Sequence, residues 1–219
     1  MRRALFAVLA FVLALPVLGQ EQKPQEITPD QLWSAMQQGN RQFVAGKLVY
    51  DNLKAERELL RGSQYPPITV LSCSDSRVPP ELVFNQSIGG LFVVRAAGNI
   101  ADDFGIASIE YAVSQGWTKL IVVLAHEDCG AVIASLGTAD PSTPALKALA
   151  ARIRSSFAGI PYNAADKENV HKATEANGRA SAAQLLAGSA MLRDAVTSGR
   201  VKLITAYYST TTGEVKQVE

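Results

Sequence analysis

Two short segments hold the residue types of a catalytic metal site. In "SCSDSR", the thiol of Cys73 stands two residues before the carboxylate of Asp75 and four before the guanidinium of Arg77. In "AHEDCG", His126 stands three residues before Cys129. Two thiolates and one imidazole supply three ligands for Zn²⁺ and leave a fourth position open, which is typical of catalytic rather than structural zinc. The sequence therefore predicts a zinc centre built from Cys73, His126 and Cys129.

A single disulfide is the alternative role for the two cysteines, and it is common in exported proteins. Their surroundings favour a site. Cys73 directly follows the apolar run "ITVLS", and His126 directly follows the apolar run "KLIVVLA". In open α/β sheets, ligands bind outside the carboxyl ends of the strands, where these side chains would meet. The other histidine, His171, lies in the polar stretch "NVHKAT" and is interpreted as a surface residue.

The elements that must position these residues follow an α/β pattern. Short apolar, β-branched runs alternate with helical patterns, which predicts a mostly parallel central sheet flanked by helices. Strands are predicted over 68–72, 91–94, 119–125 and 201–208, with a short terminal strand after "TTTGEV". Helices are predicted over roughly 102–115, 130–136, 144–157 and 178–198, and residues 28–61 form an N-terminal helical arm. Thr28 and Asp30 are its candidate caps, and its apolar face comprises Leu32, Trp33, Met36 and Phe43.

Composition limits the partners. The chain of 219 residues is 47% hydrophobic, which suits a single domain with a sizeable core. Its 21 basic and 20 acidic residues give a formal net charge of +1 without a long block of one sign. No nucleic-acid partner is therefore expected, and a small molecule or another copy of the chain is favoured.

The first residues are typical of a targeting segment. Arg2 and Arg3 precede the apolar run "ALFAVLAFVLALPVL", which is shorter than a membrane-spanning helix. Residues 1–19 are predicted to be a secretory signal peptide and residues 20–219 the mature single domain. An uncleaved anchor is the alternative. After cleavage no stable membrane anchor would remain, and the bacterial periplasm is the expected location.

The segments "CSDSR" and "HEDCGAV" resemble the two signature segments of the β-class carbonic anhydrases. The similarity includes "SQYPP", "ELVFNQSIGGLFVVRAAGN" and "SIEYAVSQGWTKLIVVL", and resumes weakly near "YYSTTTGEV". The resemblance implies an enzyme that hydrates CO₂ reversibly to bicarbonate and a proton, with one Zn²⁺ per subunit. It also implies a homodimer or tetramer, with active sites near the subunit interface and the N-terminal arm around the partner.

Asp75 and Arg77 are expected to support the reaction. Two thiolates weaken zinc as a Lewis acid, so groups beyond the ligands must orient the zinc-bound hydroxide that attacks CO₂. Arg77 is predicted to pair with Asp75 through its planar fork, and Asp75 to accept the hydrogen bond of that hydroxide. The resemblance adds a second role for Asp75, as a fourth zinc ligand in an inactive closed form.

The substrate pocket rests mainly on the resemblance. Gln64, Phe92 and Tyr111 match positions that line the CO₂ pocket in the plant-like branch of the family, while Gly130 leaves room beside Cys129. Without the resemblance, Phe92 and Tyr111 would be interpreted as core residues. Two other functions remain open: a related zinc hydrolase of CS₂ or carbonyl sulfide, and a non-catalytic zinc-binding protein.

Overall fold

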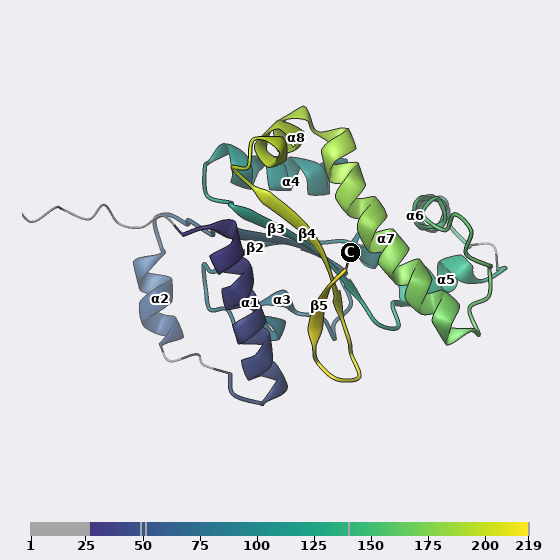
Figure 1. Ribbon diagram of the computed structural model, residues 1–219, viewed down its shortest axis with the longest axis horizontal. Coiled ribbons are helices and arrows are strands. Elements are labelled where there is room, and N and C mark those ends of the chain that lie inside the picture. The colour runs from purple at the N-terminus through teal and green to yellow at the C-terminus, as the bar shows by residue number, and fades with distance from the viewer. Residues whose placement is uncertain (1–26, 49, 51, 140, 219) are drawn as a thin grey trace, which may run out of the picture.

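A five-stranded sheet forms the centre of the protein (Figure 1). The computed structural model describes residues 27–48, 50, 52–139 and 141–218, so the predicted signal peptide lies outside the described residues. The strands are β1 (Ile68–Ser72), β2 (Leu91–Arg95), β3 (Leu120–His126), β4 (Lys202–Tyr208) and β5 (Val215–Val218). Their order is β2-β1-β3-β4-β5, with β5 alone antiparallel to its neighbour. The predicted mostly parallel sheet with a short terminal strand is confirmed.

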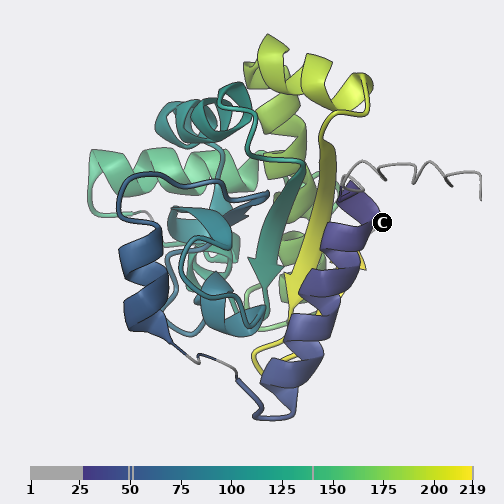
Figure 2. The same cartoon turned by 90° about the vertical axis from the view of Figure 1, so that its left-hand side faces the viewer.

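Helices cover both faces of the sheet because its central strands are apolar on both sides. Every residue of β1 and β3 is buried, as expected for parallel strands inside an α/β layer structure. One face packs against α1 (Pro29–Val44), and the other packs against α4 (Asp103–Ser114), α7 (Lys167–Gly188) and α8 (Ala190–Thr197). Figures 1 and 2 show these two layers from perpendicular directions.

The N-terminal arm consists of two helices that differ in burial. Of the two predicted caps, Thr28 is the N-cap of α1, in a capping box, whereas Asp30 lies in the first turn. The side chains of Leu32, Trp33 and Met36 enter the core. Helix α2 (Leu53–Leu59) has no buried residue, and Leu59 is 83% exposed. Both views separate α2 from α1 (Figure 2). Only the first half of the arm is therefore held by the core of its own chain.

The remaining helices correct several predicted boundaries. Helix α5 (Gly130–Leu136) has the predicted bounds, and α6 (Pro144–Arg154) ends three residues before the predicted end. The predicted helix over 178–198 has the wrong start and is not continuous: Asp166 caps a helix that begins eleven residues earlier, and Ser189 separates it from α8. Ser189 is extended and its hydroxyl accepts from the Leu192 amide, so α8 begins as a new helix. The short helix α3 (Pro80–Val83) was not predicted.

A tight 3₁₀ turn, η1 (Ala97–Asn99), follows β2 at the carboxyl edge of the sheet. Gly98 has φ +66°, a left-handed conformation that glycine adopts without strain. Within the part of the chain that the structure describes, no helix is both long and apolar enough to span a bilayer.

Candidate metal centre

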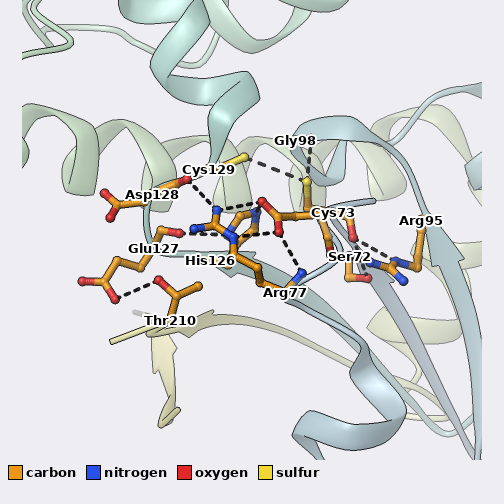
Figure 3. A network of polar contacts seen from close by, with 11 residues as sticks. Ser72, Cys73, Arg77, Arg95, Gly98, His126, Glu127, Asp128, Cys129 and Thr210 are labelled. Carbon is orange, nitrogen blue, oxygen red and sulfur yellow. Dashed lines mark hydrogen bonds and ion pairs between the residues drawn. The ribbon is translucent and has the colours of Figure 1, made fainter. Parts of the chain in front are cut away.

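The three predicted ligands meet at the carboxyl edge of the sheet (Figure 3). Cys73 follows β1, His126 ends β3, and Cys129 is the N-cap residue of α5. Because β1 and β3 are parallel neighbours, their carboxyl ends bring Cys73 and His126 together. The ligand atoms of the three residues all lie within 4.8 Å of one another, and all three residues are buried. The fold thus places two thiols and an imidazole as the sequence predicted.

Both cysteines are free, so the structure does not contain the alternative disulfide. Their sulfur atoms are 4.0 Å apart. A disulfide bond is only about 2.05 Å long, whereas two thiolates that each bind zinc at about 2.3 Å can lie this far apart. The separation therefore fits a shared metal ion.

The ring of His126 is oriented by the backbone. Its Nδ1 lies 2.9 Å from the carbonyl oxygen of Glu127, an acceptor only, so Nδ1 carries the proton and donates it. This assignment leaves Nε2 with a free lone pair. Nε2 is buried, and among the described residues it has no hydrogen-bond partner. An orphaned imidazole nitrogen beside two thiols is the pattern of a metal site.

The two thiols differ in their tendency to ionise. The pKa of the Cys73 thiol lies well below its usual range, chiefly because Cys129 donates a hydrogen bond to it. The amide of Gly98 also donates to the Cys73 sulfur, over 3.2 Å. The same contact and burial raise the pKa of Cys129. One thiolate is therefore stabilised by the polar groups of the site, and ionisation of the second needs a further positive charge, such as a metal ion.

Asp75 and Arg77 form a two-pronged ion pair next to the cluster. Arg77 donates from Nε to Oδ1 over 2.9 Å and from Nη2 to Oδ2 over 2.8 Å, and its backbone amide also donates to Oδ1. These bonds hold the pKa of Asp75 far below its usual range. Asp75 Oδ2 lies 3.9 Å from Nε2 of His126. In this arrangement the carboxylate faces Arg77 and is not one of the three clustered ligands, and its role as a fourth ligand stays a prediction.

Two further residues, Arg95 and Glu127, hydrogen-bond to segments around the site but were not predicted as site residues. Arg95, the last residue of β2, donates to the backbone oxygens of Cys73 and Asp75. Glu127 hydrogen-bonds to the hairpin between β4 and β5. Arg95 ends a strand beside Cys73, and Glu127 stands between two predicted ligands, so only their positions in the sequence pointed to the site.

The predicted pocket residues divide into two groups. Gly130 adjoins Cys129, and the space where its Cβ would lie is open. Phe92 pairs in register with Thr69, four residues before Cys73, which corresponds to about 13 Å along the strand. Tyr111 contacts Phe92, with ring centroids 6.4 Å apart, and Gln64 precedes β1 and is exposed. Within one subunit, the structure does not bring these last three side chains to the metal cluster.

Comparison with known proteins identifies the family. The profile of the carbonic anhydrase family matches residues 68–215, more than half of the chain. A carbonic anhydrase of Mycolicibacterium smegmatis is 44% identical over 113 residues, which are 51% of this chain and 55% of that protein. Carbonic anhydrase 2 of Mycobacterium tuberculosis is 41% identical over 116 residues, which are 52% of this chain and 56% of that protein. The chain thus spans about half the length of these curated relatives.

Solved structures agree in fold. The β-carbonic anhydrase of Coccomyxa, in complex with acetazolamide, superposes with a TM-score of 0.68 at 26% identity over 83% of each chain. A tetrameric β-carbonic anhydrase of Sordaria macrospora gives a TM-score of 0.68 at 24% identity, over 86% of this chain and 97% of that one. With the matching profile and the Cys-His-Cys cluster, these findings establish that the chain belongs to the β-class carbonic anhydrase family.

Proposed function

We propose that this protein is a zinc-dependent carbonic anhydrase that hydrates CO₂ reversibly to bicarbonate and a proton. The observation that carries the proposal is the buried cluster of Cys73, His126 and Cys129, with an ionised Asp75 beside it. The cluster lies in a chain of the β-class family, and the curated relatives quoted above are themselves named carbonic anhydrases.

The three clustered residues are the proposed ligands of one Zn²⁺ per subunit. Two thiols and the orphaned Nε2 of His126 suit zinc, because each offers one soft or borderline ligand atom. Bound zinc supplies a water whose pKa is lowered towards about 7, and thus a nucleophile at neutral pH. Both cysteines must be thiolates when the metal is bound, and because the site already stabilises the Cys73 thiolate, metal binding releases the proton of Cys129.

Asp75 is the proposed acceptor for the attacking water. Arg77 occupies both carboxylate oxygens from one side, so the carboxylate stays ionised and its orientation is fixed. Oδ2 is the oxygen nearer to His126, and it is placed to accept a hydrogen bond from the water and turn a lone pair towards CO₂. In an inactive form, Asp75 would leave Arg77 and become a fourth ligand.

A second subunit is proposed to complete the substrate pocket. Gln64, Phe92 and Tyr111 lie away from the metal cluster of their own chain, so they would reach the cluster of a partner. The exposure of α2 and the position of β2 at the edge of the sheet support an assembly through this side. We propose a homodimer, or a tetramer as stated for the relative from Sordaria macrospora.

Stopped-flow CO₂ hydration between about pH 6.5 and 9, with zinc quantified in the same sample, tests the function. The expected result is turnover that rises with pH and is absent in Cys73→Ser. Stoichiometric zinc without turnover at any pH would overturn the proposal. The same samples would then be assayed with CS₂ and carbonyl sulfide, and inactivity on both would leave a zinc-binding role.

Export to the periplasm is a separate proposal, together with a mature single domain of residues 20–219. It is supported by Arg2 and Arg3 ahead of an apolar run. Fractionation of cells that express the full chain, with mass spectrometry of the product, tests it. A periplasmic protein that begins near Gln20 is expected, and a full-length cytoplasmic protein would contradict it.

A further inference from the structure

Glu127 occupies a position that the proposed reaction does not use. It stands between His126 and Asp128 in the short loop that joins β3 to α5, and this loop carries two of the three proposed zinc ligands. Its carboxylate points away from the metal cluster and towards the hairpin between β4 and β5 (Figure 3). The side chain of Glu127 contacts the hairpin, and its backbone contacts a proposed zinc ligand.

On the hairpin side, one carboxylate oxygen collects several donors. Oε2 of Glu127 accepts from the Ser209 hydroxyl over 2.8 Å, from the Thr210 hydroxyl over 3.3 Å and from the Thr211 amide over 2.8 Å. The hairpin is itself closed by hydrogen bonds from Ser209 to Glu214 and from Gly213 to Ser209. The Glu127 carboxylate is therefore hydrogen-bonded to an ordered turn.

On the loop side, the backbone of Glu127 positions a proposed ligand. Its amide donates to the carbonyl of Tyr208 over 2.8 Å, and its own carbonyl accepts from Nδ1 of His126 over 2.9 Å. The next residue, Asp128, has φ +51°, a conformation that costs energy for a residue other than glycine. Such a loop needs contacts from outside to keep its shape, and Glu127 supplies them.

The hairpin is anchored at its far side as well. Asn40 of α1 donates to the carbonyl of Gly213 over 2.8 Å and accepts from the amide of Val215 over 2.8 Å. Asn40 is buried, so this anchor is shielded from water. A continuous chain of hydrogen bonds thus runs from α1 through the hairpin to Glu127 and on to His126.

We propose that Glu127 is a positioning residue, which holds the loop of His126 and Cys129 in its metal-binding shape by anchoring it to the hairpin of residues 209–214. The inference rests on the proposed zinc site. Groups that hydrogen-bond to a metal ligand typically contribute 10- to 100-fold to metal affinity, and here that group is the Glu127 carbonyl, which the anchored side chain keeps in place.

Zinc release to an excess of a chromogenic chelator tests this role in the full chain. Glu127→Ala is expected to release zinc about 10- to 100-fold faster than the wild type. Glu127→Gln keeps an oxygen that can accept the same donors, so its rate should stay within about threefold. The Co²⁺-substituted Glu127→Ala protein should also show a shifted visible spectrum, since the ligand geometry is altered.

Two further variants keep the test decisive. Glu214→Ala is the matched control, because it removes an acidic side chain of the same hairpin that pairs with exposed Lys216 instead. Its release rate should equal that of the wild type. If Glu127→Ala does not fold, the double variant of Ser209→Ala and Thr210→Val removes the two hydroxyl donors and should accelerate release.

The outcomes separate this inference from the proposed function. Wild-type release rates and cobalt spectra in Glu127→Ala, or in the double variant where that one is used, would overturn the positioning role alone. A wild-type protein that binds no zinc would overturn the proposed function, and with it the basis of the inference.

Discussion

The polar groups around the proposed zinc ligands, at the carboxyl end of the sheet, are largely paired within one chain, whereas aromatic groups at the amino end remain exposed. Around Cys73 and His126, backbone and side-chain donors and acceptors are paired, and Nε2 of His126 is left for a metal. At the other end, Tyr65 is 69% exposed and Tyr111 is 51% exposed, although each contacts Trp117 edge-on. Exposed aromatic clusters of this kind mark contact surfaces.

This difference separates two parts of the proposed enzyme. In the proposed assembly, the metal-binding end needs only its own chain, while Phe92 and Tyr111 at the other end would line the site of a second copy. Changes at the first end should therefore alter metal binding in any oligomeric state. Changes at the second should alter activity through the partner and leave metal binding intact.

The largest expected effect is the loss of zinc at the carboxyl end. His126→Ala removes a proposed ligand, so zinc affinity should fall by more than the roughly 100-fold upper range seen for outer partners. Zinc content after dialysis, measured by atomic absorption, should drop from one per subunit to near zero. His171→Ala is the control, because His171 is a surface residue of α7 that pairs with Glu175, and it should keep full zinc. Full zinc in His126→Ala would contradict the site.

The amino end should show a smaller loss with a distinctive rescue. Phe92→Ala is expected to lower kcat/KM by about 10- to 100-fold while zinc stays bound, because a pocket wall is lost and CO₂ is held less well. After subunit exchange with an equal amount of Cys73→Ser protein, about half of the dimers should be mixed, and each mixed dimer should contain one intact site of two. About a quarter of wild-type activity should therefore be restored. Stopped-flow assays before and after subunit exchange measure it. No restoration after proven exchange would show that Phe92 serves its own subunit.

The sequence located the elements of the metal-binding end well and some of the helices less well. The strand before Cys73 and the strand that ends at His126 are buried on both faces, so their apolar runs located both strands: β1 has its predicted bounds, and β3 is displaced by one residue. The ligand types and their short spacing then identified the metal site. The predicted helix over 178–198 missed the true start, because α7 begins in a polar, solvent-facing stretch capped by Asp166. It also missed the break at Ser189, whose side chain hydrogen-bonds to the backbone and caps a new helix.

Other parts of the site were out of reach of local patterns. Arg95 and Glu127 act through partners 20 to 84 residues away in the chain, and no periodicity encodes such pairs. Gln64, Phe92 and Tyr111 were assigned by resemblance alone, and their distance from the cluster within one subunit became visible only with the sheet register.

Substitutions in the core and in the N-terminal arm should differ in how they change the free energy of unfolding. Ile109→Val trims a fully buried side chain of α4 and should lower the free energy of unfolding by about 0.5 to 1.5 kcal/mol. Leu59→Lys changes an exposed residue of α2, so its effect should depend on whether a partner covers that residue. Urea unfolding at several protein concentrations distinguishes them. The Ile109→Val deficit should be constant, and that of Leu59→Lys should grow as concentration rises. A constant deficit for Leu59→Lys would place α2 outside the assembly surface.

The smallest expected effect concerns the ion pair of Asp75 and Arg77. Hydrogen bonds from the Arg77 side chain are the main reason that the pKa of Asp75 is lowered in the folded protein. A lowered pKa stabilises the fold fully above the pKa of the unfolded chain, about 4, and the contribution is lost as the pH falls further towards the folded-state pKa. Because the Arg77 side chain is 51% exposed, solvent screens the pair and the total effect is modest.

Arg77→Met tests this contribution in the zinc-free protein. Its deficit in the free energy of unfolding, measured in urea from about pH 7 to 3, should be constant above about pH 4 and shrink below it. Lys216→Met is the matched control, because Lys216 pairs with Glu214 on the exposed hairpin and should show almost no deficit at any pH. A deficit of Arg77→Met that stays constant down to about pH 3 would mean that Arg77 stabilises the loop through its bond to the Asp128 carbonyl rather than through the Asp75 carboxylate, since a backbone acceptor does not titrate.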